Sequence, residues 1–211
     1  MNTQTIHITQ ASKTGKLEGI NSINTSVLNN PFCDKMRKGN DILKRTELSI
    51  VCEACYAATL EKQYNNLHIA ITRNDNLLSS APLSDRQLPV IMDRVLRFHS
   101  LGELINIQHL DNFCAIAKHN PETFFVLWSK RTDLINKYFS DNDKPINLSL
   151  IYSSPKVGKI ESLPIHFDKV FTVHAKKPSN DNIDINCHSK CKDCMLCYSK
   201  NDVIYINEVV K

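Results

Sequence analysis

The sequence predicts a single α/β domain over residues 1–211, with a mostly parallel sheet that forms a partial or open (β/α) barrel and a C-terminal cysteine-rich loop. Short apolar segments alternate with helical segments after residue 94, which is typical of βαβ units. The 211 residues fall short of the ~250 that a complete eightfold barrel typically needs. Four of the eight cysteines lie close together in the last quarter of the chain.

Each element is predicted from its local pattern. Segment 109–119 places Leu110, Phe113 and Ile116 at helical spacing, and Asn120-Pro121 ends it. Segment 203–209 alternates apolar and polar side chains, as a half-buried strand does. Similar criteria predict one or two helices over 56–78, a helix over 131–139, and further strands at 5–9, 48–51, 94–99, 123–128, 147–152 and 170–174.

Composition excludes several classes of protein. Lys plus Arg is 26 and Asp plus Glu is 22, so the net charge of +4 argues against nucleic-acid binding. No apolar run approaches the roughly 18–20 residues that span a bilayer, and the polar N-terminus has no signal-peptide core. Eight cysteines without a secretory signal indicate metal or redox chemistry in the cytoplasm.

The strongest motif is C-x3-C-x2-C-x2-C, formed by Cys187, Cys191, Cys194 and Cys197. Its tight spacing is nearly the mirror of the bacterial ferredoxin motif. Structural zinc sites usually split their ligands into two separated pairs. The motif therefore favours a [4Fe-4S] cluster, with zinc as the alternative.

A second group of cysteines precedes the predicted barrel. Cys52 and Cys55 form a C-x2-C pair followed by Tyr56, and Cys33 stands ahead of a basic loop at 35–45 that we expect to be solvated. Cys114 lies on an apolar helix face and is predicted to be a core residue. The other seven cysteines are predicted metal ligands, either of one shared cluster or of two separate centres.

Polar side chains follow the predicted strands at their carboxyl ends, where ligands bind in α/β folds. Arg97, His99, Lys130 and His174 are the cations and imidazoles of this rim. Each has a plainer interpretation as a hydrogen-bonded surface residue. Together they predict a small anionic or polar ligand.

Several motifs occur in an order that resembles a phage-borne family, the gene product 88-like proteins. They are Asn-Pro-Phe-Cys at 30–33, Cys-x2-Cys-Tyr-Ala at 52–57, Arg-Phe-His-Ser-x-Gly-Glu at 97–103, Trp-Ser-Lys-Arg at 128–131 and the C-terminal cysteines. That family is described as similar to radical S-adenosylmethionine enzymes. The resemblance covers roughly residue 25 to the end, and implies an iron–sulfur protein on a radical-enzyme-like barrel in the host cytoplasm.

The chain departs from the radical-enzyme pattern C-x3-C-x2-C at its first position. Leu48 stands where that cysteine is expected, and Cys33 is the candidate to replace it from a distance. Glu103 stands where the family usually has Asp, so a carboxylate is retained.

Three functions remain open at this stage. The first is an enzyme whose open iron binds S-adenosylmethionine, with an electron donor as partner and a set of ligand-binding side chains: Tyr56, Arg97, His99, Glu103, Lys130 and His174. The second is a non-catalytic iron–sulfur protein for electron transfer, sensing or host interaction. The third is a zinc-stapled binding module.

Overall fold

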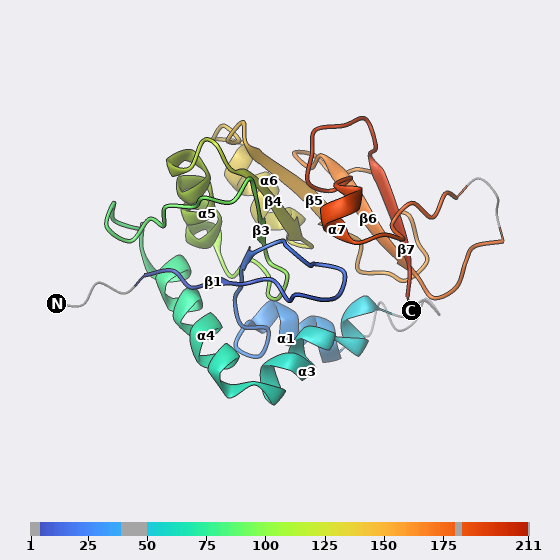
Figure 1. Ribbon diagram of the computed structural model, residues 1–211, viewed down its shortest axis with the longest axis horizontal. Coiled ribbons are helices and arrows are strands. Elements are labelled where there is room, and N and C mark those ends of the chain that lie inside the picture. Colours follow the sequence, from blue (N-terminus) through green and yellow to red (C-terminus); the bar gives the residue numbers. More distant parts are fainter. Residues whose placement is uncertain (1–4, 39–49, 180–182, 211) are drawn as a thin grey trace.

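A seven-stranded sheet forms the centre of the computed structural model, which describes residues 5–38, 50–179 and 183–210 (Figure 1). The strands are β1 (Ile8–Thr9), β2 (Ser22–Ile23), β3 (Val95–Phe98), β4 (Phe124–Ser129), β5 (Leu148–Ser153), β6 (Lys169–His174) and β7 (Tyr205–Val209). They pair in chain order, parallel from β2 to β7, with β1 antiparallel to β2. The sheet is open and does not close into a barrel, which confirms the parallel α/β prediction in its open form.

Seven helical segments accompany the sheet in the part of the chain that the structure describes. They are α1 (Pro31–Lys38), the 3-10 helix η1 (Val51–Ala54), α3 (Tyr56–Gln63), α4 (Asn65–Ser80), α5 (Ile107–His119), α6 (Thr132–Phe139) and α7 (Cys191–Cys194). The pair α3 and α4 confirms the prediction over 56–78. The connection from β5 to β6 holds no helix, and that from β6 to β7 holds only α7 among its described residues.

Two predictions around the N-terminal cysteines are corrected. Where the expected strand at 48–51 is described, Ile50 makes an isolated antiparallel bridge to Lys156 and Val51 begins η1; residues 48–49 lie outside the described part. The predicted basic loop is helical at 35–38, while 39–45 lie outside the described residues. Helix α1 forms because the Asn30 side chain accepts hydrogen bonds from Phe32 N (2.9 Å) and Cys33 N (3.3 Å), with proline at the first helical position.

The sheet is buried on both faces by different parts of the chain. Alternation along β3 and β4 turns Leu96, Phe98 and Phe125 toward a core shared with α4, α5 and α6. On the opposite face, Val126 and Trp128 pack with a second cluster that includes Cys197, Tyr198 and Ile206. Cys114 lies in the helix-side core with an exposed fraction of 1%, which confirms the prediction of a core residue.

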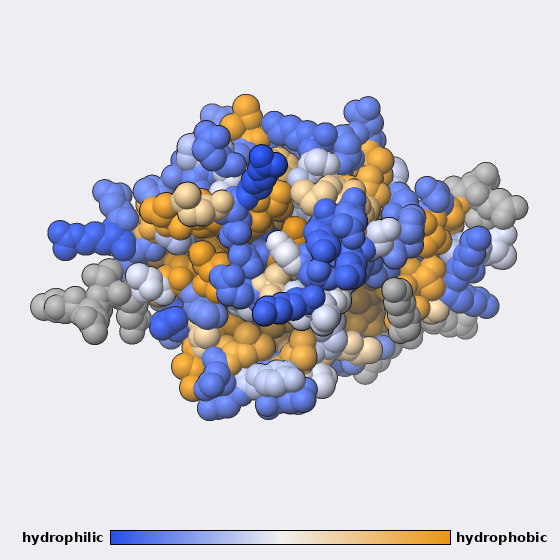
Figure 2. Space-filling view, viewed as in Figure 1, coloured by the Kyte–Doolittle hydropathy of each residue, from blue (hydrophilic) through white to orange (hydrophobic). Residues whose placement is uncertain are grey.

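The surface over α7 is hydrophilic, as the space-filling view shows (Figure 2). Lys190, Lys192 and Asp193 are exposed there. None of the described helices is both long enough and apolar enough to cross a membrane.

A buried acidic network holds the segment that leads into α1. The Glu61 carboxylate, from α3, accepts hydrogen bonds from Val27 N (2.9 Å) and Leu28 N (3.2 Å) and from the Ser26 hydroxyl. Asp75, from α4, accepts one from Ser26 N (2.9 Å). Burial and, to a smaller extent, the nearby Glu61 charge raise the pKa of Asp75 to about 7.

Asp75 should therefore make stability depend on pH. Its pKa in the folded protein lies above the ordinary value of 3.8, so the stability it contributes is present below that value and is lost as the pH rises through about 7. Between about pH 5 and pH 8, the free energy of unfolding of the wild type should fall by on the order of 2 kcal/mol more than that of Asp75→Asn. The variant keeps the acceptor for Ser26 N but has no carboxyl group to titrate. Urea unfolding at both pH values measures this, with exposed Asp85→Asn as the control. Parallel pH profiles for the wild type and Asp75→Asn would contradict the assignment.

Candidate functional site

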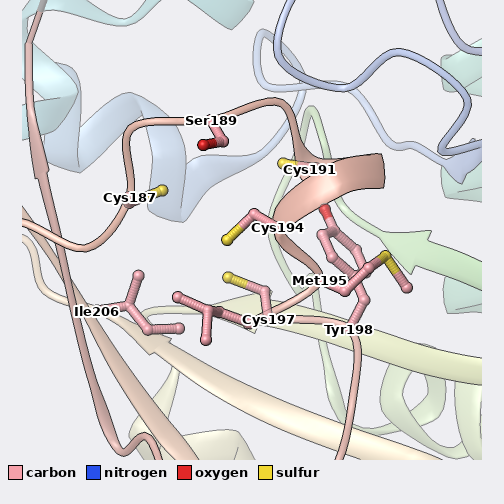
Figure 3. Close-up of a pocket in the computed structure, with 9 residues that line it drawn as sticks. Cys187, Ser189, Cys191, Cys194, Met195, Cys197, Tyr198 and Ile206 are labelled. Atoms are coloured by element: carbon pink, nitrogen blue, oxygen red, sulfur yellow. The ribbon is translucent and has the colours of Figure 1, made fainter.

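The C-terminal cysteine segment lies against the sheet face opposite the helices. The thiol groups of its four cysteines point toward one shared space (Figure 3). That space is a small cavity with a floor that includes Tyr198 and Ile206. Backbone hydrogen bonds hold the first part of the segment: Cys187 N donates to Asn207 O on β7 (3.1 Å), and Cys191 N donates to Lys16 O (2.8 Å).

A tight local geometry brings the last three thiols together. Cys191 and Cys194 begin and end the short helix α7, and Met195 then adopts the left-handed conformation with φ of 53°. Met195 N donates back to Cys191 O (3.0 Å) and Tyr198 N to Met195 O (2.9 Å). The reversal carries Cys197 back toward the same space as its neighbours.

Burial opposes ionisation of Cys187, Cys191 and Cys197. It raises the pKa of Cys197 to about 12, and it also raises the pKa of Cys187 and Cys191. The positive charges of Lys16 and Arg97 partly offset this rise. Among the described side chains that line the cavity, only those of Ser189 and Tyr198 carry an oxygen or nitrogen atom. The four thiols therefore form a soft donor set, which is suited to zinc or to iron–sulfur clusters.

The N-terminal cysteines form a second group, built from three elements. Cys33 lies on α1, Cys52 in η1 and Cys55 directly before α3. Helix α1, which carries Cys33, packs against η1, which carries Cys52. Burial raises the pKa of both thiols. Cys33 and Cys55 also pack against one apolar cluster that includes Val27 and Leu101.

Glu103 and Lys130 border this second group. The buried Glu103 carboxylate accepts hydrogen bonds from the Ser129 hydroxyl (2.6 Å), Lys130 N (2.7 Å) and Leu104 N (2.9 Å). Lys130 Nζ donates to Ser153 Oγ (3.0 Å), which ties together the carboxyl ends of β4 and β5. The charges of Glu103 and Lys130 both act on the pKa of Cys33, in opposite directions. Glu103 and Lys130 therefore lie together at the carboxyl end of β4, next to the second group of cysteines.

The loop after β3 depends on residues that the sequence analysis did not single out. The buried Asn24 Oδ1 accepts hydrogen bonds from Ser100 N (2.9 Å), the Ser100 hydroxyl (2.9 Å) and Leu101 N (3.0 Å). Gly102 has φ of 106°, and a Cβ there would lie 2.2 Å from the Thr25 hydroxyl, so only glycine fits. Asn24 follows β2 directly, and its position at a strand end was the available signal.

The other predicted ligand-binding residues do not lie together in one site. Arg97 faces the C-terminal cysteines rather than the rim, because it alternates with Leu96 and Phe98. His99 is buried, has φ of 64°, and neither ring nitrogen has a hydrogen-bond partner among the described residues. Burial lowers its pKa to about 3. His174 is the last residue of β6, and its Nε2 lies 3.1 Å from Asn207 Oδ1 on β7. The Tyr56 side chain is 60% exposed, and its hydroxyl donates to Ser100 O (2.7 Å).

The structure keeps the two cysteine groups apart. The first group packs against the α3 cluster and the second against the sheet face. As the side chains stand, no three His, Cys, Asp or Glu residues within 5–38, 50–179 and 183–210 are arranged to hold one metal ion.

The comparisons with known proteins give one family. No match was found among curated proteins or among solved structures. The family model described as Gene product 88 matches residues 9–203, which include both cysteine groups and every strand from β2 to β6. The chain therefore belongs to the Gene product 88 family, a family of phage proteins.

Proposed function

We propose that this protein binds iron–sulfur clusters at two centres, one formed by each cysteine group. The observation that carries the proposal is the convergence of four thiols on one space on the sheet face (Figure 3). Burial raises the pKa of these thiols, so they stay protonated in the absence of a metal. A metal that binds them displaces the protons and converts the thiols to thiolate ligands. A cluster binds each thiolate to a different iron, so its ligands stand farther apart than those of a single ion.

The C-terminal centre would be closed. Its four cysteines would complete the coordination of a [4Fe-4S] cluster and leave no iron free for a ligand. The surrounding side chains, which include Tyr198 and Ile206, would exclude water from the sulfur side. Such a centre carries charge or holds the fold. A non-catalytic iron–sulfur protein is therefore the second candidate function, and the closed ligand set favours it.

The N-terminal centre would be open. Three cysteines would leave one iron of a four-iron cluster available, and a cluster of this kind supplies one-electron chemistry to a bound ligand such as S-adenosylmethionine. Lys130 would provide the positive charge for the ligand's carboxylate. Glu103 would position Lys130, because it binds the backbone nitrogen of that residue through its buried carboxylate.

Iron and acid-labile sulfide in anaerobically purified protein test the proposal. Two four-iron centres predict about eight iron and eight sulfide per chain. Protein made with iron available that contains stoichiometric zinc and no sulfide would overturn the proposal in favour of the zinc-stapled module.

Single cysteine variants test whether the centres are separate. We expect Cys194→Ser and Cys55→Ser each to lose about half of the iron, because each removes one centre. Cys194→Ser should also lower the free energy of unfolding by several kcal/mol, on the order of a structural metal site's contribution. Cys114→Ala, which alters a core cysteine, is the matched control and should keep its iron. Loss of all iron in both serine variants would show one shared cluster instead.

Addition of S-adenosylmethionine distinguishes the enzyme from the closed electron carrier. The electron paramagnetic resonance spectrum of the reduced wild type should change on addition, because the open iron gains new ligands. Cys194→Ser should retain this change and Cys55→Ser should lose it. An unchanged wild-type spectrum would favour the non-catalytic protein.

A further inference from the structure

Arg97 occupies a position between the sheet and the C-terminal cysteines. Its guanidinium carbon lies 3.8 Å from the centroid of the Trp128 ring. Its Nε donates to His99 O (3.1 Å), and its Nη1 donates to the Tyr198 hydroxyl (3.4 Å). These contacts fix a planar cation over an aromatic ring on the face that the cysteine segment covers.

The charge of Arg97 reaches the thiols directly and through Tyr198. It lowers the pKa of Cys191 and of Cys197 against the opposite effect of burial. Tyr198, whose hydroxyl accepts from Arg97 Nη1, lines the same cavity as the four cysteines. Arg97 therefore reaches the edge of that cavity through Tyr198.

The other charges near this group are neutralised or held elsewhere. Lys16 acts on Cys187 but forms an ion pair with Glu208. Lys169 lies near Cys197, and its Nζ donates to Asn201 Oδ1 (2.8 Å) and Val203 O (2.6 Å). Within the described part of the chain, no carboxylate forms a salt bridge with Arg97. Its charge is available to the cysteine centre.

We propose that Arg97 is a positioning residue that raises the reduction potential of the C-terminal cluster. This inference rests on the proposed function, since it requires a cluster at the four cysteines. Reduction adds one electron to a centre that already carries the negative charge of four thiolates. A nearby cation stabilises the reduced form, and so raises the potential.

Anaerobic redox titration of the full chain, followed by electron paramagnetic resonance, tests this. Arg97→Gln should shift the midpoint potential of the C-terminal centre to more negative values, and Arg97→Lys should restore part of the shift. Cys55→Ser is the background for every variant, so that only the C-terminal centre is observed. Arg94→Gln is the matched control: it removes the same charge from an exposed position just before β3, and should leave the potential unchanged.

Tyr198→Phe provides a second route if Arg97→Gln fails to retain its cluster. It removes the hydroxyl that holds Arg97 Nη1 at the edge of the cavity, and should shift the potential in the same direction by a smaller amount. Cluster-loaded variants of Arg97 and Tyr198 with the wild-type potential would overturn the inference and leave the proposed function standing. A wild type without iron and sulfide would instead overturn the proposed function.

Discussion

Parallel strands need apolar cover on both faces, and helices α4, α5 and α6 cover only one face of this sheet. The other face carries Val126, Trp128 and Ile151, which would meet water if the cysteine segment were absent. That segment is held by few regular hydrogen bonds, because its helix has only four residues. What keeps it in place therefore decides whether the sheet is stable. A metal centre formed by its four thiols would provide that restraint.

The same segment joins the two ends of the chain. The backbone of Lys16 accepts the hydrogen bond of Cys191 N, and Glu18 forms ion pairs with Lys190 (2.5 Å) and Lys192 (2.6 Å). The two lysines lower the pKa of Glu18 to about 2. Closing a loop of more than 170 residues costs chain entropy. Exposed ion pairs contribute little to offset it, so the buried contacts around the thiols carry more of the restraint.

The strands after residue 94 could be predicted to within one or two residues, because each is an apolar run bounded by helix or turn signals. Helix α1 was missed because it has one buried residue, Met36, and so lacks the apolar periodicity of a core helix; its signal was the Asn30-Pro31 cap. The position of Glu103 beside Lys130 follows from strand ends that meet at one rim. Arg97 could not be placed from the sequence, because only the fold shows which face the cysteine segment covers.

We propose that the two cysteine groups hold two separate iron centres. Anomalous diffraction at the iron absorption edge, from crystals of anaerobic protein, locates iron directly. The account predicts two peaks, one bordered by Cys33, Cys52 and Cys55 and the other by the four C-terminal cysteines. A single peak ligated by both groups, or a signal at the zinc edge alone, would contradict it.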